Sequence, residues 1–206
     1  MENRTDQRVF WHGKLKKESR ETWQATALTA LCSVALFCLL FSYKKMYPFG
    51  DGSVAITDLY SQYLPLLYHF YDVVTGQKNL FLDFSVSGGA NLYADTINEV
   101  LNPFNYVLLL FGRDRIYQAV NVLVLLYSTA SAVTAHIFLE KIASGRRFQN
   151  VALAVCYACC GYMAYNYQII KWMIFPVIFP LFCLALLRLL RSKRARKCSA
   201  DKLIRN

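Results

Sequence analysis

The sequence predicts an all-α integral membrane protein, with about four transmembrane helices and two interfacial or re-entrant helices in the first outer loop. Hydrophobic residues make up 56% of its 206 residues and charged residues only 17%, whereas soluble domains average about 25% charged. The apolar residues are also concentrated, because no charged residue occurs within 23–43, 116–139, 148–170 or 172–187. A transmembrane helix needs about 20 mostly apolar residues, and the last run reaches that length if Arg188 extends its charged end toward water.

The positively charged residues predict which side of the membrane each loop occupies. The net charge is +10, but the lysines and arginines flank the hydrophobic runs instead of forming a soluble basic face. Positive-inside topology explains this pattern better than nucleic-acid binding does. Most of the 23 lysines and arginines lie in 1–22, in 140–147 and from Arg188 onward. These segments are predicted to be cytoplasmic, so the protein is a multi-pass plasma-membrane protein with both termini inside the cell.

The chain divides into predicted segments in a simple order. The polar N-terminus is followed by an apolar run longer than a signal-peptide core, which indicates an uncleaved anchor. The predicted segments are a cytoplasmic tail (1–22), a first span (23–43), an outer loop (44–115), a second span (116–139), a cytoplasmic loop (140–147), a third span (148–170), a fourth span (172–190) and a basic cytoplasmic tail (191–206).

The seven cysteines give no sign of a disulfide scaffold or a zinc site. Six of them lie inside the hydrophobic runs and none lies in the predicted outer loop. The CYACC stretch at 156–160 has a CxxC spacing, but no second pair of ligands accompanies it. We interpret these cysteines as small packing residues of the spans.

The predicted outer loop contains two apolar segments of its own. Across 60–74 the apolar side chains recur at three- and four-residue steps, which is typical of a helix. Its many tyrosines favour a position in the membrane interface, where one end of the side chain is apolar and the other is wet. Gly76 is a plausible end of this helix. The second segment, 102–112, is too short to span and begins Asn-Pro, so we expect a re-entrant or interfacial helix.

Asp58 is the leading candidate for chemistry. It follows Thr57 at the start of the first interfacial helix. A structural explanation is helix capping, because a carboxylate is favourable beside the unpaired N–H groups of a first turn. A functional explanation is an acid held in apolar and aromatic surroundings, where a carboxylate can act as a general base or bind a divalent cation. Both explanations can hold together, because a capping position is also a fixed position.

Five further residues are candidates for auxiliary roles. Gln62 and Tyr63 follow Asp58 by four and five residues, where they could orient an acceptor hydroxyl or a lipid phosphate. Asp95 and Glu99 form either a solvated acidic turn or, with Asp58, a site for Mg²⁺ or Mn²⁺. Lys171, the single cation between the last two runs, either anchors a helix end at the interface or binds a lipid-linked phosphate.

The outer loop resembles a known family. The stretch YPFGDGSVAITDLYSQYLPLLYHFYDVVTGQ, with the later NPFNYVLLLF, is similar to the opening of the YfhO family of bacterial membrane proteins, within the GT-C superfamily of glycosyltransferases. The resemblance covers about 47–190. It implies transfer of a sugar from a polyprenyl-phosphate donor to a cell-envelope polymer of the teichoic-acid type, on the outer face. Asp58 matches the family's catalytic or metal-linked acid, and the absence of an adjacent acid implies that Asp95 or Glu99 supplies the partner.

The same resemblance implies a longer enzyme, because members of that family have many more spans. We therefore expect the chain to correspond to the N-terminal module of such a transferase. The alternative is a catalytically inactive structural or partner-binding membrane protein. A transporter is a weaker alternative, because no predicted span carries a charged residue in its interior, where transport pathways often need one.

Overall fold

The structure is a computed structural model that describes residues 4–84 and 89–204. Within this part of the chain, helices dominate and a single short hairpin supplies the strands. The elements in order are α1 (Arg4–Tyr43), the π-helix η1 (Leu59–Tyr63), α2 (Leu64–Val74), β1 (Leu82–Asp83), β2 (Ala90–Asn91), α3 (Tyr93–Asp95), the π-helix η2 (Thr96–Val100), the 3₁₀-helices η3 (Pro103–Leu110) and η4 (Arg113–Arg115), α4 (Ile116–Ile142), α5 (Arg147–Ala158), α6 (Gly161–Asn166), the 3₁₀-helix η5 (Ile170–Met173) and α7 (Ile174–Ile204).

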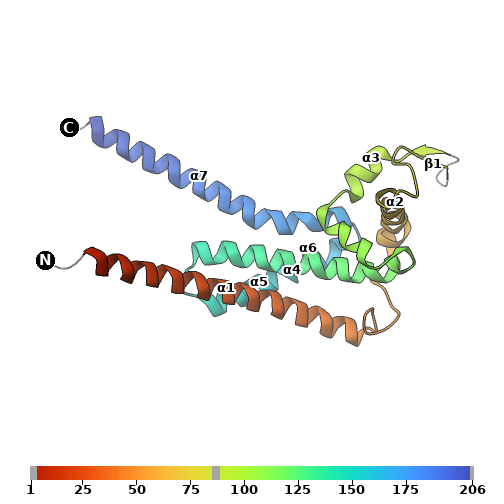
Figure 1. The fold of residues 1–206 in the computed structure, drawn as a ribbon, viewed down its shortest axis with the longest axis horizontal. Coiled ribbons are helices and arrows are strands. Elements are labelled where there is room, and N and C mark those ends of the chain that lie inside the picture. Colours follow the sequence, from red (N-terminus) through yellow and green to blue (C-terminus); the bar gives the residue numbers. More distant parts are fainter. Residues whose placement is uncertain (1–3, 85–88, 205–206) are drawn as a thin grey trace.

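Three of the described helical segments are long and apolar enough to cross a membrane: Arg20–Tyr43, Arg113–Ile142 and Ile170–Arg191. They correspond to the first, second and fourth predicted spans, and the prediction of an all-α membrane protein is confirmed. Figure 1 shows α1, α4 and α7 running along the long axis of the molecule, with the start of α1 and the end of α7 at the same end.

The third predicted span, 148–170, is not one continuous helix. Helix α5 ends at Ala158 and α6 begins at Gly161, while Cys160 between them has an extended backbone. A helix of 12 residues rises about 18 Å, well short of the hydrocarbon core of about 30 Å. Gly161 follows the break, and glycine favours a helix end over a helix interior. Together α5 and α6 return the chain to the end of the bundle where α7 starts (Figure 1).

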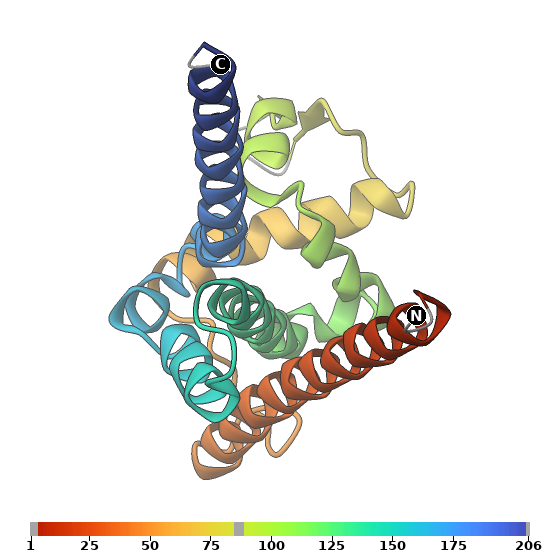
Figure 2. The same ribbon diagram turned by 90° about the vertical axis from the view of Figure 1, so that its left-hand side faces the viewer.

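Helix α2 lies across the end of the bundle, as expected for an interfacial helix. Viewed along the bundle, it runs perpendicular to the long helices (Figure 2). It ends where predicted, because Gly76 has a φ of 75°, a backbone conformation that glycine adopts without strain. The second predicted helix is η3, whose start is capped by the Asn102 side chain accepting a hydrogen bond from the Phe104 N–H (3.0 Å).

A buried apolar core joins η1 and α2 to the long helices. Leu59, Leu67 and Phe70 are almost completely buried against side chains of α4 such as Ile116 and Leu123. Burying a Leu or Phe side chain stabilises a fold by roughly 1.5–3 kcal/mol. The helix that follows Asp58 is therefore held firmly on the end of α4.

Candidate functional site

A buried asparagine fixes the segment that leads to Asp58. Asn121, completely buried on α4, donates from Nδ2 to the carbonyl oxygens of Tyr47 (3.1 Å) and Gly52 (3.0 Å). Its Oδ1 accepts a hydrogen bond from the Val54 N–H (2.8 Å). The amide thus uses both its donors and its acceptor on backbone groups, and it ties this segment to the start of the second predicted span.

Thr57 has an unusual backbone conformation immediately before Asp58. Its φ is 45°, a region that β-branched residues rarely adopt. The Thr57 hydroxyl donates to Oε1 of Gln168, and the Thr57 carbonyl accepts from the Ser61 hydroxyl (2.9 Å). Strained residues of this kind persist where surrounding contacts hold them, and they are frequent at functional sites. The contact with Gln168 also brings the Asp58 segment beside the chain that leads to Lys171.

Asp58 is exposed, and its backbone is already helical at φ −63° and ψ −33°. Its side chain makes no hydrogen bond to the first turn of η1. Asp58 therefore occupies the predicted N-cap position of η1 without supplying a side-chain capping hydrogen bond. The carboxylate makes no hydrogen bond within the described part of the chain, so it is open to solvent and to a ligand.

Tyr63, Glu99 and Lys171 meet beside Asp58, although they come from three separate segments. The Tyr63 hydroxyl donates to Oε2 of Glu99 (2.7 Å), and Nζ of Lys171 donates to Oε1 of Glu99 (2.5 Å). Asn98 donates to the same carboxylate (2.8 Å). We call Tyr63, Glu99 and Lys171 the Glu99 cluster.

The electrostatics of the Glu99 cluster follow from burial and charge. Burial alone raises the pKa of Glu99, but the hydrogen bonds from Lys171 and Tyr63 outweigh it and leave this pKa below its ordinary value. Burial raises the pKa of Tyr63, and the negative charges of Glu99 and Asp58 raise it further. The Tyr63 hydroxyl therefore stays protonated at neutral pH.

The other sequence candidates do not join this cluster. Gln62 and Asp95 are both exposed, and neither side chain makes a hydrogen bond in the described part of the chain. Among the described residues, no group of three or more His, Cys, Asp or Glu side chains could hold a metal ion. The predicted metal set of Asp58, Asp95 and Glu99 is therefore not assembled, because Lys171 and Tyr63 occupy the Glu99 carboxylate.

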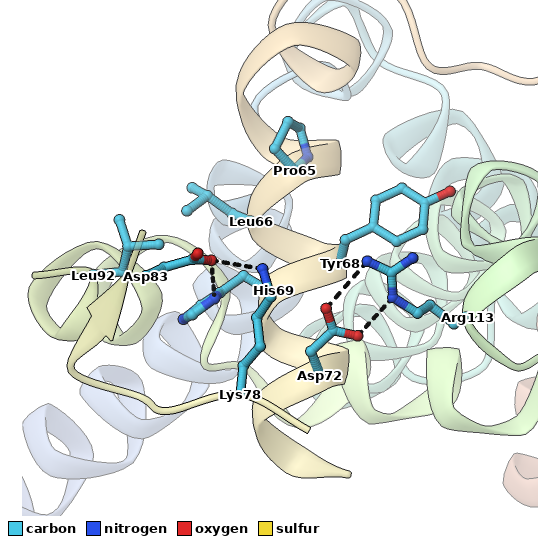
Figure 3. A pocket seen from close by; sticks show the side chains of 9 residues that line it. All are labelled: Pro65, Leu66, Tyr68, His69, Asp72, Lys78, Asp83, Leu92 and Arg113. Atoms are coloured by element: carbon cyan, nitrogen blue, oxygen red, sulfur yellow. Dashed lines mark hydrogen bonds and ion pairs between the residues drawn. The ribbon is translucent and has the colours of Figure 1, made fainter. Parts of the chain in front are cut away.

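The sequence reasoning missed a second polar group at the far end of α2. Arg113 donates from Nε and Nη2 to Oδ1 and Oδ2 of Asp72 (2.7 and 3.2 Å). Asp83 lies 3.0 Å from Nδ1 of His69 and accepts a hydrogen bond from Nζ of Lys78 (2.8 Å). These five residues line a cavity of about 380 Å³ (Figure 3). Asp72 and Arg113 lie 41 residues apart, so no local sequence pattern indicated their pairing.

Two further hollows border the Asp58 segment. An apolar cavity of about 360 Å³ has Lys44 as the charged side chain among the described residues that line it, and Tyr167 also lies in its wall. An open groove of about 650 Å³ runs along η1 and α2, where Tyr60, Tyr68 and Tyr117 supply aromatic rings. We call it the tyrosine groove.

The long apolar helices, the helix across their end and the burial pattern define an integral membrane protein with a structured loop region at one end of its bundle. A family model described as bacterial membrane protein YfhO matches residues 29–197. The chain therefore belongs to the YfhO family. No match was found among curated proteins or among solved structures.

Proposed function

We propose that the protein is a membrane glycosyltransferase, or the N-terminal module of one, that transfers a sugar from a polyprenyl-phosphate donor to a cell-envelope polymer on the outer face. The observation that carries the proposal is the position of Asp58. It is an exposed carboxylate on a firmly packed helix start, beside the Glu99 cluster. The family that the chain belongs to supports a membrane protein of the GT-C-like group.

Asp58 acts as the general base in this proposal. It accepts the proton of an acceptor hydroxyl while that oxygen forms a bond to the anomeric carbon of the sugar. The bond from this carbon to the donor phosphate breaks, and polyprenyl phosphate leaves with the electron pair. A positioned general base contributes about 10²–10⁴-fold to a rate.

Lys171 is the proposed contact for the departing phosphate. An ammonium group has three donors, and the structure gives one of them to Glu99. Glu99 then positions Lys171 and also holds the Tyr63 hydroxyl. Glu99 therefore has a supporting role, because its largely buried carboxylate fixes Lys171 and Tyr63, which face the proposed substrate.

The apolar cavity supports a lipid-linked donor. Its walls are mostly apolar side chains of α1, α4 and α6, which suit a hydrocarbon chain. Tyr167 in its wall immediately precedes Gln168, the residue bonded to Thr57. A prenyl chain in this cavity would therefore end close to the Asp58 segment, where the sugar must lie.

In this proposal, Asp58 is the protein carboxylate that would hold a divalent cation. Mg²⁺ is commonly held by one or two carboxylates together with substrate phosphates and water, so a three-carboxylate set is not required. We derive no step through the ion. Its contribution is checked by comparing transfer before and after treatment with EDTA.

The deciding experiment is Asp58→Asn in the protein purified from membranes, assayed with a radiolabelled polyprenyl-phosphate sugar. We expect transfer to fall at least 100-fold while membrane insertion stays unchanged. Asp51→Asn is the matched control, because Asp51 is another exposed acid of the same loop outside the Glu99 cluster. Transfer at the wild-type rate by Asp58→Asn would overturn the role of Asp58. No transfer by the inserted wild-type protein would favour the structural or partner-binding alternative.

A further inference from the structure

The cavity lined by Asp72 and Asp83 is separate from the Asp58 site. Asp72 follows Asp58 by 14 residues along η1 and α2, which corresponds to about 20 Å at 1.5 Å per residue. In Figure 3, Lys78 approaches this cavity from one side of α2 and Arg113 from the other. The cavity therefore has two cations facing a shared hollow, each held by its own carboxylate.

The charges of the cavity are arranged by depth. The Asp72 side chain is 3% exposed while its partner Arg113 is 47% exposed. Asp83 is 6% exposed and Lys78 is 34% exposed. The acids are therefore buried beneath the cations, and a ligand entering the cavity meets positive groups first.

The buried acids also fix the direction of the cations. Asp72 binds two nitrogens of the Arg113 guanidinium, and the guanidinium lies over the Tyr68 ring at 5.1 Å from its centroid. The guanidinium carries five N–H donors, so donors remain after the contact with Asp72. Asp83 is held by His69 as well as by Lys78, because Nδ1 of His69 lies 3.0 Å from Oδ2 of Asp83. The His69 Nε2 atom has no hydrogen-bond partner in the described part of the chain.

A purely structural role, in which these ion pairs hold the predicted outer loop against α4, does not by itself account for this arrangement. Apolar residues of similar size often stabilise a fold as well as a buried ion pair does, because desolvating charges is costly. A rigid guanidinium beside an ammonium group matches the oxygens of a phosphate, which accept two parallel hydrogen bonds from arginine.

We propose that this cavity is a binding site for a phosphate group, contacted by Lys78 and Arg113 and positioned by Asp72 and Asp83. The site does not depend on sugar transfer, so it stands or falls independently of the proposed function. Because α2 lies across the end of the bundle (Figure 2), the phosphate could belong to a lipid headgroup or to a soluble phosphate ester. Both share the chemistry that the cavity recognises.

Binding can be measured directly on the purified chain. In the lipid arm, native mass spectrometry compares retention of phosphatidylglycerol with retention of oleate, an anionic lipid without phosphate. In the soluble arm, thermal stability in detergent is followed as glycerol 3-phosphate is added, with glycerol as the reference. We expect preferential retention of phosphatidylglycerol, a saturable rise in melting temperature with glycerol 3-phosphate, or both, and the arm that responds identifies the source.

Three variants test the residues. Lys78→Gln removes one cation and leaves Asp83 in contact with His69. The double variant Asp72→Asn/Arg113→Gln removes the other cation together with the acid that it neutralises. Neither of these two variants leaves a buried carboxylate without a partner. Both should weaken phosphate binding at least tenfold. Arg115→Gln is the control, because Arg115 is an exposed arginine of the same short helix as Arg113. It removes one positive charge outside the cavity, as Lys78→Gln does inside it, and should bind phosphate as the wild type does.

Three results would overturn the proposal. They are the absence of binding in both arms, equal retention of oleate and phosphatidylglycerol without a response to glycerol 3-phosphate, and equal loss of binding in Arg115→Gln and in Lys78→Gln. The last result would mean that the chain attracts phosphate through its net charge alone.

Discussion

Glu99 shows how a single carboxylate can organise side chains from distant parts of the chain. Its partners Tyr63 and Lys171 lie 36 and 72 residues away. Its side chain is 11% exposed, and a carboxylate at that depth needs hydrogen bonds and a counter-charge to remain ionised. The cluster supplies both, so Glu99 in η2 links η1 to η5, the short helix that precedes α7.

The lowered pKa of Glu99 predicts a pH dependence of stability. Its ordinary value is 4.5, and the folded protein holds the pKa below that value. The stabilisation is therefore complete above pH 4.5 and is lost as the pH falls through the folded-state pKa. The melting temperature of Glu99→Gln should fall less steeply than that of the wild type below pH 4.5. Lys171→Met should flatten the curve similarly, because it removes the main group that lowers this pKa. Parallel curves for all three proteins would contradict the role of Glu99.

At the residue scale, the sequence indicated several of the right residues but not their contacts. Tyr63, Glu99 and Lys171 were recognisable by type and by place in the predicted topology. Glu99 was predicted to belong to a solvated acidic turn or a metal site, and Lys171 to anchor a helix end or bind a phosphate. The structure pairs the two side chains with each other. Contacts between segments this far apart depend on how helices pack, which a local pattern does not encode.

At the scale of the element, α2 depends on its buried face. Leu67 is completely buried between α2 and the bundle, whereas Val74 on the same helix is 40% exposed. Replacing a buried leucine by alanine typically costs about 2–5 kcal/mol, because a cavity remains. Leu67→Ala should therefore lower the free energy of unfolding in detergent by that amount, and Val74→Ala should change it by less than about 1 kcal/mol. Equal effects would show that α2 is not held through this face.

We expect water to reach the chain at the break between α5 and α6. Irregular backbone is tolerated at membrane depth only where protein or water meets its polar groups. Cys159 lies in this break and lines the apolar cavity, whereas Cys183 lies within α7. In a background without other cysteines, Cys159 should react with a membrane-impermeant maleimide and Cys183 should not. Protection of Cys159 in intact membranes would mean that water does not reach the break and would contradict the prediction.

The break was hidden from sequence reasoning for a physical reason. Hydropathy measures whether a segment of 20 residues prefers lipid, and 148–170 meets that criterion. It does not register where a helix ends, and here α5 ends at Ala158 and α6 begins at Gly161. The predicted interfacial helix, in contrast, was found because its apolar spacing and its glycine stop agree with each other.

At the scale of the whole molecule, the charge pattern predicts that both termini lie in the cytoplasm and that the loop containing α2 lies outside. The start of α1 and the end of α7 lie at one end of the bundle, and α2 lies at the other (Figure 1). A reporter inserted after Gly76 should therefore be outside the cell, and one inserted after Gly145 should be in the cytoplasm. Reporters on the same side would refute both the predicted orientation and the number of crossings.

The helical segment of η1 and α2, which connects Asp58 to Asp72, has one further consequence. Pro65 and Tyr68 line the tyrosine groove and also the phosphate cavity, so the two hollows adjoin along α2. A long acceptor lying in the groove would have one unit near Asp58 and another near Arg113. Because the intervening backbone is helical and packed on α4, the interval between those units is about 20 Å and cannot stretch. The rigid segment formed by η1 and α2 would then set a fixed distance between an anchored phosphate and the unit of the polymer that is modified.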